Sequence, residues 1–298
     1  MNVNDIAFPN LGIYLENVPK RISIGGFDIA FYGILIGIGM ILGCLIAAKE
    51  IKNRGMDENV IWDLSIYVIF FSIVGARTYY VVMSWDLYKD NLLSIFNLRQ
   101  GGLAIYGGVI AGAITVITYC RIKKISFLPY VDAIVMGLLT GQIIGRWGNF
   151  FNREVFGGYS DGLFAMRLPI DAIRSQADIS SDIAAHIVEG TNYIQVHPTF
   201  LYEGIWNLML LVIIFLYRKH KWFEGELFCI YGLGYGIGRF FIESIRTDQL
   251  YVPGTTVPVS MVVASVSAVV SLICIIVMRK KCPRTQYLVD KVESGGNK

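Results

Sequence analysis

The segment GRWGNFFNREVFGG, residues 145–158, places several groups that can bind an anion at the end of an apolar stretch. Arg146 and Asn149 are close to one helical turn apart, and Arg153 follows if the helix continues, so all three lie within roughly 60° of one another around the axis. Arginine offers a planar fork that binds phosphate in two places and keeps its proton. The spacing therefore predicts a cationic, hydrogen-bonding face suited to a phosphodiester.

A second stripe of the same kind lies in YGIGRFFIESIR, where Tyr235, Arg239, Glu243 and Arg246 follow at helical spacing. Two arginine-bearing stripes predict an anionic ligand held between them. The structural alternative is that each arginine reaches the membrane interface or pairs with a glutamate, as Arg239 would with Glu243.

Three further polar residues interrupt apolar stretches. His197 opens HPTFLYE, residues 197–203, as a helix cap or a titrating group, and a lone histidine is more often structural. Glu203 of the same motif needs an arginine or a bound ligand beside it. Arg77 is interpreted as a structural residue that either forms an ion pair or extends its side chain to the membrane interface.

The composition places these residues in a bilayer. Of the 298 residues 54% are hydrophobic and 16% charged, with a mean hydropathy of +0.54. The net charge of +3, with basic residues clustered between apolar runs, predicts lipid headgroups and no nucleic acid as partners. The five cysteines form no CxxC, and neither HExxH nor an acidic cluster occurs, so we expect no disulfide, no metal and no cofactor.

Apolar runs of about 20 residues, the length that a helix needs to cross a membrane, predict the fold class. We expect an all-α polytopic membrane protein with about seven transmembrane helices, and residues 1–298 as a single integral membrane domain. The first 26 residues lack the order of a secretory signal, so the first run is expected to stay as an anchor. The runs lie near residues 27–48, 60–83, 103–120, 128–149, 198–217, 227–243 and 256–278.

Lysine and arginine in the short loops predict the orientation. The basic set comprises Lys49, Lys52, Arg54, Arg121, Lys123, Lys124, Arg218, Lys219, Lys221, Arg279, Lys280, Lys281 and Arg284. The opposite loops, with Lys89 and Arg99 among them, are sparser, so the N-terminus is expected outside and the C-terminus in the cytoplasm. Residues 150–197 then form an external cap between spans four and five, in which LPIDAIRSQADISSDIAAHIVEG is predicted to make short amphipathic helices.

Glycines at helical spacing, such as Gly137 and Gly141 in the fourth run, have two interpretations. Close helix packing through small residues is the favoured one. The alternative is that some of them leave room for a lipid chain.

GRWGNFFNREVFGG closely resembles the signature of the prolipoprotein diacylglyceryl transferase family of bacterial cytoplasmic membranes. FYG at 31–33, GGLAIYGG at 101–108, HPTFLYE and YGIGRFFIESIR add to the resemblance in the expected order. The resemblance implies transfer of the diacylglyceryl group of phosphatidylglycerol to the lipobox cysteine of a preprolipoprotein signal peptide, which forms a thioether and releases glycerol 1-phosphate. It also implies an inner-membrane site that faces outward, among membrane lipids.

The resemblance also implies roles for single residues. Those expected in catalysis are Arg146, Arg239, Asn149 and Glu154, with the two arginines stabilising charge on the departing phosphate. Those expected to bind substrate are Arg146, Tyr32, Tyr106, Asn152, Gly157, His197, Glu203, Tyr235 and Glu243. Glu243 and Tyr235 would orient Arg239, and Tyr32 would line the lipid site.

Tyr106 departs from the family, which often has histidine at this position of GGLAIYGG. A neutral tyrosine accepts protons poorly, so Tyr106 either positions a substrate or relays a proton. The arginines are expected to lower the pKa of the thiol, with His197 or Glu154 as acceptors. The alternative function is an organic-anion or lipid carrier that uses the same arginine pair, for which broken helices and a two-fold repeat would be the signs. A lipid-binding scaffold also stays open.

Overall fold

The computed structural model describes residues 2–98 and 101–282. The chain folds into two compact units, one of residues 1–43 and 135–298 and the other of residues 44–134. Arg99 and Arg284, which entered the prediction of orientation, lie outside the described residues.

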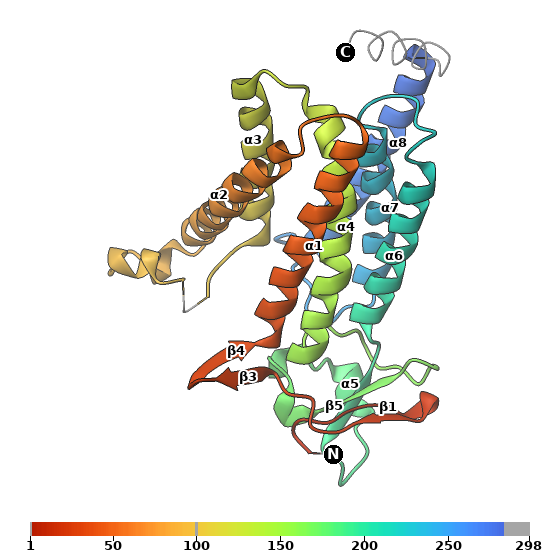
Figure 1. Ribbon diagram of the computed structural model, residues 1–298. Helices are drawn as coiled ribbons and strands as arrows, with labels where there is room; N and C mark the ends of the chain where they lie inside the picture. The colour runs from red at the N-terminus through yellow and green to blue at the C-terminus, as the bar shows by residue number, and fades with distance from the viewer. Residues whose placement is uncertain (1, 99–100, 283–298) are drawn as a thin grey trace. The chain divides into compact units, whose positions relative to one another are not determined.

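Long helices dominate both units (Figure 1). They are α1 (Phe31–Asn53), α2 (Asn59–Met83), α3 (Ile105–Lys123), α4 (Phe127–Asn152), α6 (Thr199–Tyr217), α7 (Glu226–Glu243) and α8 (Val259–Lys281). Each coincides with a predicted apolar run. All except α7 are long and apolar enough to cross a membrane, which gives six candidate spans among the described residues and a mostly helical polytopic membrane protein. The count of seven spans stays a prediction.

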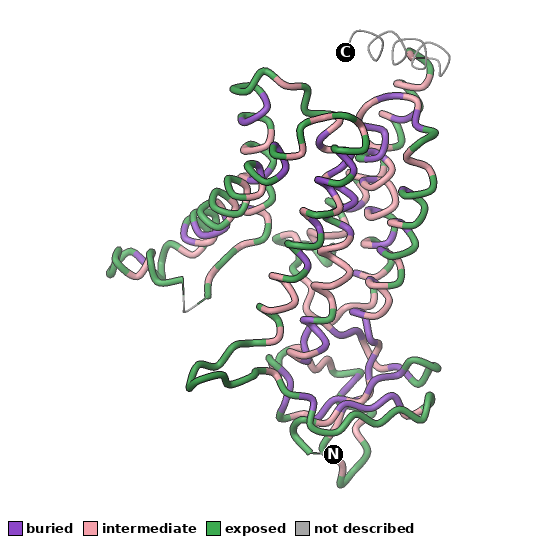
Figure 2. Tube along the Cα trace, in the orientation of Figure 1, coloured by how far each residue is buried: buried purple, intermediate pink, exposed green. Residues whose placement is uncertain are grey.

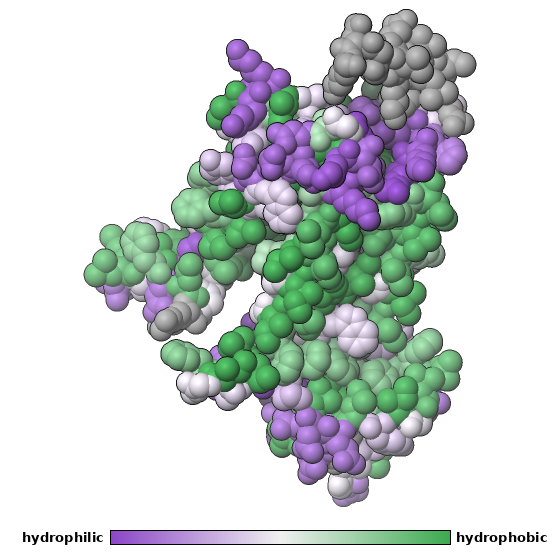
Figure 3. Space-filling model, viewed as in Figure 1, coloured by the Kyte–Doolittle hydropathy of each residue, from purple (hydrophilic) through white to green (hydrophobic). Residues whose placement is uncertain are grey.

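Apolar side chains cover the outside of these helices. Ile41 of α1 is 61% exposed and Leu216 of α6 is 73% exposed. Figure 3 shows a hydrophobic surface over α1 and α6. Water would not stabilise such a surface, whereas lipid chains would, so the exposed apolar residues agree with a membrane environment.

Small residues bring helices of the first unit close together. A Cβ atom on Gly43 of α1 would lie 2.6 Å from the carbonyl oxygen of Gly137 on α4, and one on Gly39 would lie 3.2 Å from the carbonyl oxygen of Gly141. Backbones can approach so closely only where no side chain intervenes. The prediction of close packing is therefore confirmed for Gly137 and Gly141.

The cap of the first unit is built on a four-stranded sheet of order β2-β1-β5-β6. Its strands are β1 (Ile6–Phe8), β2 (Ile13–Leu15), β5 (Met166–Pro169) and β6 (Tyr193–Val196), and β1 pairs antiparallel with both β2 and β5. The cap thus combines the N-terminal segment with residues 150–197. Figure 2 shows buried stretches of the chain, in purple, within the cap.

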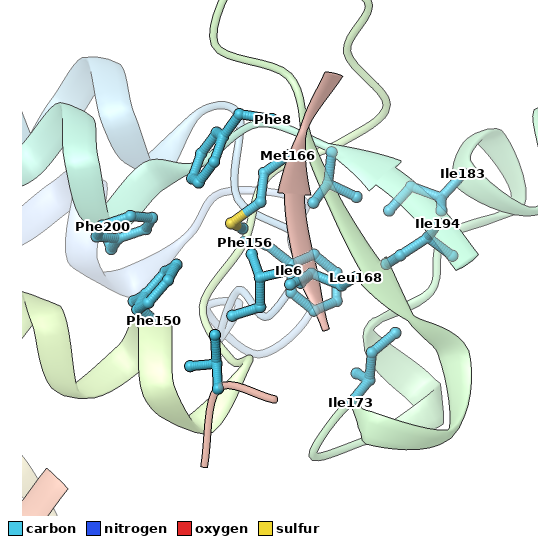
Figure 4. Packing of buried hydrophobic residues seen from close by; sticks show 12 residues of the cluster. Ile6, Phe8, Phe150, Phe156, Met166, Leu168, Ile173, Ile183, Ile194 and Phe200 are labelled. Atoms are coloured by element: carbon cyan, nitrogen blue, oxygen red, sulfur yellow. The ribbon is translucent and has the colours of Figure 1, made fainter. Parts of the chain in front are cut away.

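A buried apolar cluster joins the cap to the helices (Figure 4). Met166 and Leu168 of β5 pack there with Phe156, while Phe150 of α4 and Phe200 of α6 contribute from the helix ends. The rings of Phe150 and Phe200 lie 5.0 Å apart. This cluster fixes the end of α4 relative to the start of α6, where the signature residues lie.

The predicted short helices of the cap are confirmed in part. The segment begins in β5, continues through single 3-10 turns at Ile170–Ala172 and Gln176–Asp178, and contains only one short α-helix, α5 (Ser181–Ala185). Pairing of β5 with strands on both sides uses its backbone groups in the sheet and buries Leu168. Long-range pairing therefore takes Leu168 and Pro169 of this segment into the sheet.

An exposed hairpin leads directly into α1. It consists of β3 (Arg21–Ile24) and β4 (Phe27–Ala30), joined by Gly25 and Gly26 at positive φ. Paired positions place Ile24 opposite Phe27, and both side chains are exposed. The first span begins at Phe31 because this hairpin takes up the residues before it.

In the second unit α2 and α3 pack against each other. A Cβ atom on Gly75 would lie 2.7 Å from the carbonyl oxygen of Gly107. Arg77 of α2 is buried, and its guanidinium donates to the carbonyl oxygens of Ser94, Ile95, Asn97, Gly101 and Gly102 at 2.7–3.3 Å. The structural interpretation of Arg77 is thus confirmed, with backbone carbonyls in place of a carboxylate.

Candidate active site

Glu203 of α6 is the centre of a buried ion-pair cluster in the first unit. It is 3% exposed, and its Oε1 atom accepts a hydrogen bond of 3.0 Å from Nη1 of Arg239 on α7. Its Oε2 atom pairs with Nη2 of Arg146 on α4. The expectation of an arginine beside Glu203 is confirmed, and one carboxylate holds together both arginines of the two predicted stripes.

The second stripe continues this network beyond α7. Nη2 of Arg239 lies 2.5 Å from Oε2 of Glu243, as the i,i+4 spacing predicts. Although α7 ends at Glu243, Arg246 keeps the same side, with Nη1 at 3.6 Å from Glu243 and two hydrogen bonds to Asp248 at 2.9 and 2.7 Å. Bidentate pairing of this kind fixes both the position and the plane of a guanidinium.

Tyr235 lies on α7 one turn before Arg239. Its ring stacks on that of Tyr231 at 5.4 Å, and the Tyr231 hydroxyl accepts a hydrogen bond from Gln142 of α4. In the described contacts of Arg239, Glu203 and Glu243 orient the guanidinium, while Tyr235 belongs to the neighbouring aromatic stack. The orienting role of Tyr235 stays a prediction.

Glu154 is the centre of a second cluster, just beyond the end of α4. Its flanking residues Arg153 and Val155 have φ of 54° and 59°, a left-handed conformation that is costly without glycine. This turn aims a buried carboxylate back at the helix end. Its Oε1 atom accepts hydrogen bonds from the amides of Asn149 at 3.1 Å and Asn152 at 3.2 Å.

Arg153 does not share the face of Arg146 and Asn149, and that prediction is wrong. The helix ends at Asn152, so the side chain of Arg153 turns into the cap, where it is 1% exposed. It donates to the carbonyl oxygens of Asn4 and Val18 at 2.8 and 2.6 Å. Burial lowers the pKa of Arg153, and the residue holds the N-terminal segment on the helix end.

Arg174 of the cap completes the Glu154 cluster. Its Nη1 atom donates to Oε2 of Glu154 at 2.5 Å. The side chain of Arg174 is 71% exposed, in contrast to 6% for Glu154. The hydrogen bond from Arg174 to this carboxylate raises the pKa of Arg174.

Tyr32 and Asp178 lie close to these clusters. The ring of Tyr32, at the start of α1, packs closely on Gly148, since a Cβ atom added to Gly148 would lie 2.5 Å from a ring carbon of Tyr32. Tyr32 also lies within electrostatic reach of Glu154 and Arg146. Asp178 feels the charges of both Arg174 and Arg246, and burial raises its pKa. The two clusters thus belong to one polar region.

Gly157 and His197 form the wall next to this region. The Gly157 amide donates to the His197 carbonyl oxygen at 3.0 Å, and a Cβ atom on Gly157 would lie 2.8 Å from the Cβ atom of His197 and from the Ile245 carbonyl oxygen. Nδ1 of His197 lies 3.2 Å from the Tyr202 hydroxyl. Burial lowers the pKa of His197, which favours the neutral imidazole.

The other predicted site residues all belong to the first unit, whereas Tyr106 belongs to the second. It is the second residue of α3, and the amide of Ala104 just before that helix donates to the carbonyl oxygen of Ala76 on α2. Among residues 2–98 and 101–282, no group of three His, Cys, Asp or Glu side chains is placed to hold a metal ion.

Sequence reasoning missed Arg174 and Asp248. Arg174 lies in irregular backbone between two 3-10 turns, where no periodicity predicts the direction of a side chain. Asp248 follows Arg246 by two residues, and this proximity in the sequence is the one signal that pointed to it.

Comparison with known proteins decides the family. The model of the prolipoprotein diacylglyceryl transferase family matches residues 19–278. The chain belongs to this family. The resemblance of its signature segments is thereby confirmed, and the Glu203 and Glu154 clusters consist of residues of a transferase.

Relatives within the family cover most of the chain. A protein of Clostridioides difficile strain 630 is 43% identical over 228 residues, 76% of this chain and 83% of its own length. One of Listeria monocytogenes serotype 4a is 39% identical over 275 residues, 92% and 94%, and one of Bacillus cytotoxicus is 40% identical over 283 residues, 93% and 99%. All three are named phosphatidylglycerol-prolipoprotein diacylglyceryl transferase.

Proposed function

We propose that this transferase moves the diacylglyceryl group of phosphatidylglycerol to the thiol of the lipobox cysteine in a preprolipoprotein signal peptide. A thioether forms, and glycerol 1-phosphate is released. The names of the relatives give the substrates. The observation that carries the proposal for this chain is the convergence of Arg146 and Arg239 on Glu203, because such a cluster suits a phosphodiester at the end of apolar helices.

Residues 1–298 form a single integral membrane domain with seven spans in this proposal. α7 is the additional span, since its 18 residues extend about 27 Å, close to the hydrocarbon thickness of about 30 Å. Its first residue, Glu226, is fully buried and accepts a hydrogen bond of 2.7 Å from Arg279 of α8. This charge therefore faces a partner and not lipid.

The N-terminus lies outside and the C-terminus in the cytoplasm. Basic residues at the ends of α3 and α8 support this orientation, with Arg121 and Lys123 in the last turn of α3. The cap of residues 150–197 and the arginine clusters then face the outer side of the bacterial inner membrane, where signal peptides of exported lipoproteins emerge.

The arginines act on the charge that develops during transfer. Sulfur attacks C3 of the glyceryl group, the carbon–oxygen bond breaks, and the electron pair leaves with the phosphate. Arg146 and Arg239, whose side chains are 19% and 15% exposed, stabilise this charge where little water competes. Glu203 and Glu243 hold both guanidiniums in place, so little reorganisation is needed.

The remaining residues position the substrates. Asn149 and Glu154 act at the headgroup, Asn152 holds Glu154, and Tyr32 lines the lipid site beside Gly148. Tyr235 helps to orient Arg239, one turn further along α7, and Gly157 allows the close approach of His197.

The thiol, with a reference pKa of about 8.5, must lose its proton. The arginine field favours the thiolate, and either His197 or Glu154 accepts the proton. His197 suits this role because burial lowers its pKa and keeps the ring neutral. Tyr106 positions a substrate or relays the proton, and full turnover of a Tyr106→Phe variant would rule out the relay.

An assay with headgroup-labelled phosphatidylglycerol and a lipobox peptide tests this proposal. We expect the purified protein in detergent to release labelled glycerol phosphate with the cysteine peptide and not with its serine counterpart. Release should disappear in folded Arg146→Ala and Arg239→Ala variants. Tight lipid binding without release would instead support the carrier or the scaffold.

A further inference from the structure

Arg174 stands apart from the other arginines of the site in its exposure. The side chains of Arg146, Arg239 and Arg246 are 19%, 15% and 10% exposed, whereas that of Arg174 is 71% exposed. Its one ion pair uses Nη1. Because a guanidinium carries five N–H donors, Arg174 can bind an anion from the side away from Glu154.

The exposure of Arg174 matters because the other arginines of the site already pair with carboxylates. The described site contains four arginines (146, 174, 239 and 246) and four carboxylates that pair with them (154, 203, 243 and 248). Each of these four arginines already pairs with a carboxylate, so a phosphodiester must compete with a carboxylate for the guanidinium that it binds. Such an anion needs an arginine that can leave its carboxylate at low cost.

Arg174 meets this requirement best. Arg239 pairs with both Glu203 and Glu243, and Arg246 is held in two places by Asp248, so neither turns away easily. Among the described residues Arg146 and Arg174 each have a single ion pair, but the side chain of Arg174 is 71% exposed and that of Arg146 only 19%. The Oε1 atom of Glu154 keeps its two amide donors when Arg174 moves, which lowers the cost of the exchange.

Other arginines hold the N-terminal segment and the sheet of the cap in place. Arg153 ties the N-terminal segment to the helix end through three carbonyl oxygens. Arg167 of β5 bonds to Gln195 and packs on the Tyr193 ring. By contrast, Arg174 pairs with Glu154, a residue of the family signature just beyond the end of α4.

We propose that Arg174 is a substrate-binding residue that takes the phosphate of phosphatidylglycerol in exchange for the Oε2 atom of Glu154. This inference rests on the proposed function. The exchange frees one oxygen of Glu154 in the site. That oxygen accepts the thiol proton as the sulfur–carbon bond forms, and the phosphate leaves with the electron pair of the broken carbon–oxygen bond, so charge and protons balance.

The test measures equilibrium binding of headgroup-labelled phosphatidylglycerol in neutral detergent micelles, together with turnover on the lipobox peptide. Arg174→Gln should weaken lipid binding and raise the KM for the lipid about tenfold, since one charge-assisted hydrogen bond is lost. The KM for the peptide should not change. Added glycerol 1-phosphate should inhibit the variant about tenfold less well.

Arg167→Gln is the matched control, since it removes the same charge from the same cap and should bind lipid like the wild type. Unchanged lipid binding in Arg174→Gln would overturn the proposal. A lower kcat with unchanged lipid KM and inhibition would also overturn it, because Arg174 would then only position Glu154. If Arg174→Gln does not fold, Arg174→Ala decides, and wild-type lipid binding by that variant would overturn the proposal.

The outcome separates this inference from the proposed function. A wild type that binds lipid but never releases glycerol phosphate refutes the transferase, while the binding comparison still decides whether Arg174 contacts phosphate. A wild type with full turnover and an Arg174→Gln variant with wild-type lipid binding refutes the inference alone.

Discussion

Glu203→Gln removes the charge at the centre of the first cluster and leaves the shape unchanged. Glu203 is 3% exposed and pairs with Arg146 and Arg239, and Nη1 of Arg246 is 4.0 Å from its Oε1 atom. Removal of one partner from a buried pair costs about 3–5 kcal/mol. Glutamine still accepts one hydrogen bond, so we expect the lower value, about 3 kcal/mol.

Thermal unfolding in detergent measures this cost. A loss of about 3 kcal/mol corresponds to a fall in Tm of roughly 5 °C for a chain of this size. Because two arginines then lack their shared carboxylate, phosphatidylglycerol should restore part of the loss, and a neutral lipid should not. Glu189→Gln, an exposed carboxylate of the cap, is the control and should shift the Tm by less than about 2 °C.

Two results would refute this reasoning. A Tm within about 2 °C of the wild type would mean that the arginines do not depend on Glu203. If neutral and anionic lipids restored the Tm equally, Arg146 and Arg239 would not bind the headgroup.

Three further predictions concern other parts of the chain. Arg77→Gln loses its bonds to backbone carbonyls and should destabilise the protein by about 3 kcal/mol in chemical unfolding. Burial lowers the pKa of His197, so the unfolded chain binds a proton on this residue more tightly than the folded chain does. The stability of the protein should therefore fall as the pH drops below about 6.5. A series of Tm values against pH should show a smaller fall for the His197→Gln variant. Gly43→Ala, which meets the Gly137 carbonyl, should cost about 1–3 kcal/mol, whereas Gly33→Ala, with no atom within 4 Å of the new Cβ, should be neutral or stabilising in the same assay.

Residues on regular helices could be predicted well from the sequence. Apolar runs of sufficient length indicate helices whatever the tertiary structure, and helical spacing then places Arg239 and Glu243 on one side. The need of Glu203 for an arginine followed from the cost of a bare carboxylate among apolar residues. That Glu203 pairs with two arginines at once depends on how α4, α6 and α7 pack together, and the spacing of residues in the sequence does not reveal this packing.

Residues beyond helix ends could not be predicted in the same way. Arg153 leaves the face of Arg146 because non-glycine residues adopt left-handed backbone on both sides of Glu154, and no local signal announces this. The strand β1 joins the cap through pairing of Ala7 with Arg167 of β5, 160 residues further along the chain. Arg174 is brought to Glu154 by that fold, and its role became visible only there.

Mass spectrometry of a lipobox peptide after incubation with the protein and phosphatidylglycerol tests the central claim most directly. The account predicts that the peptide gains one diacylglyceryl group on its cysteine, as a thioether that resists hydroxylamine, and that the serine peptide gains nothing. A cysteine peptide that stays unmodified, with a protein that folds and binds phosphatidylglycerol, would contradict it.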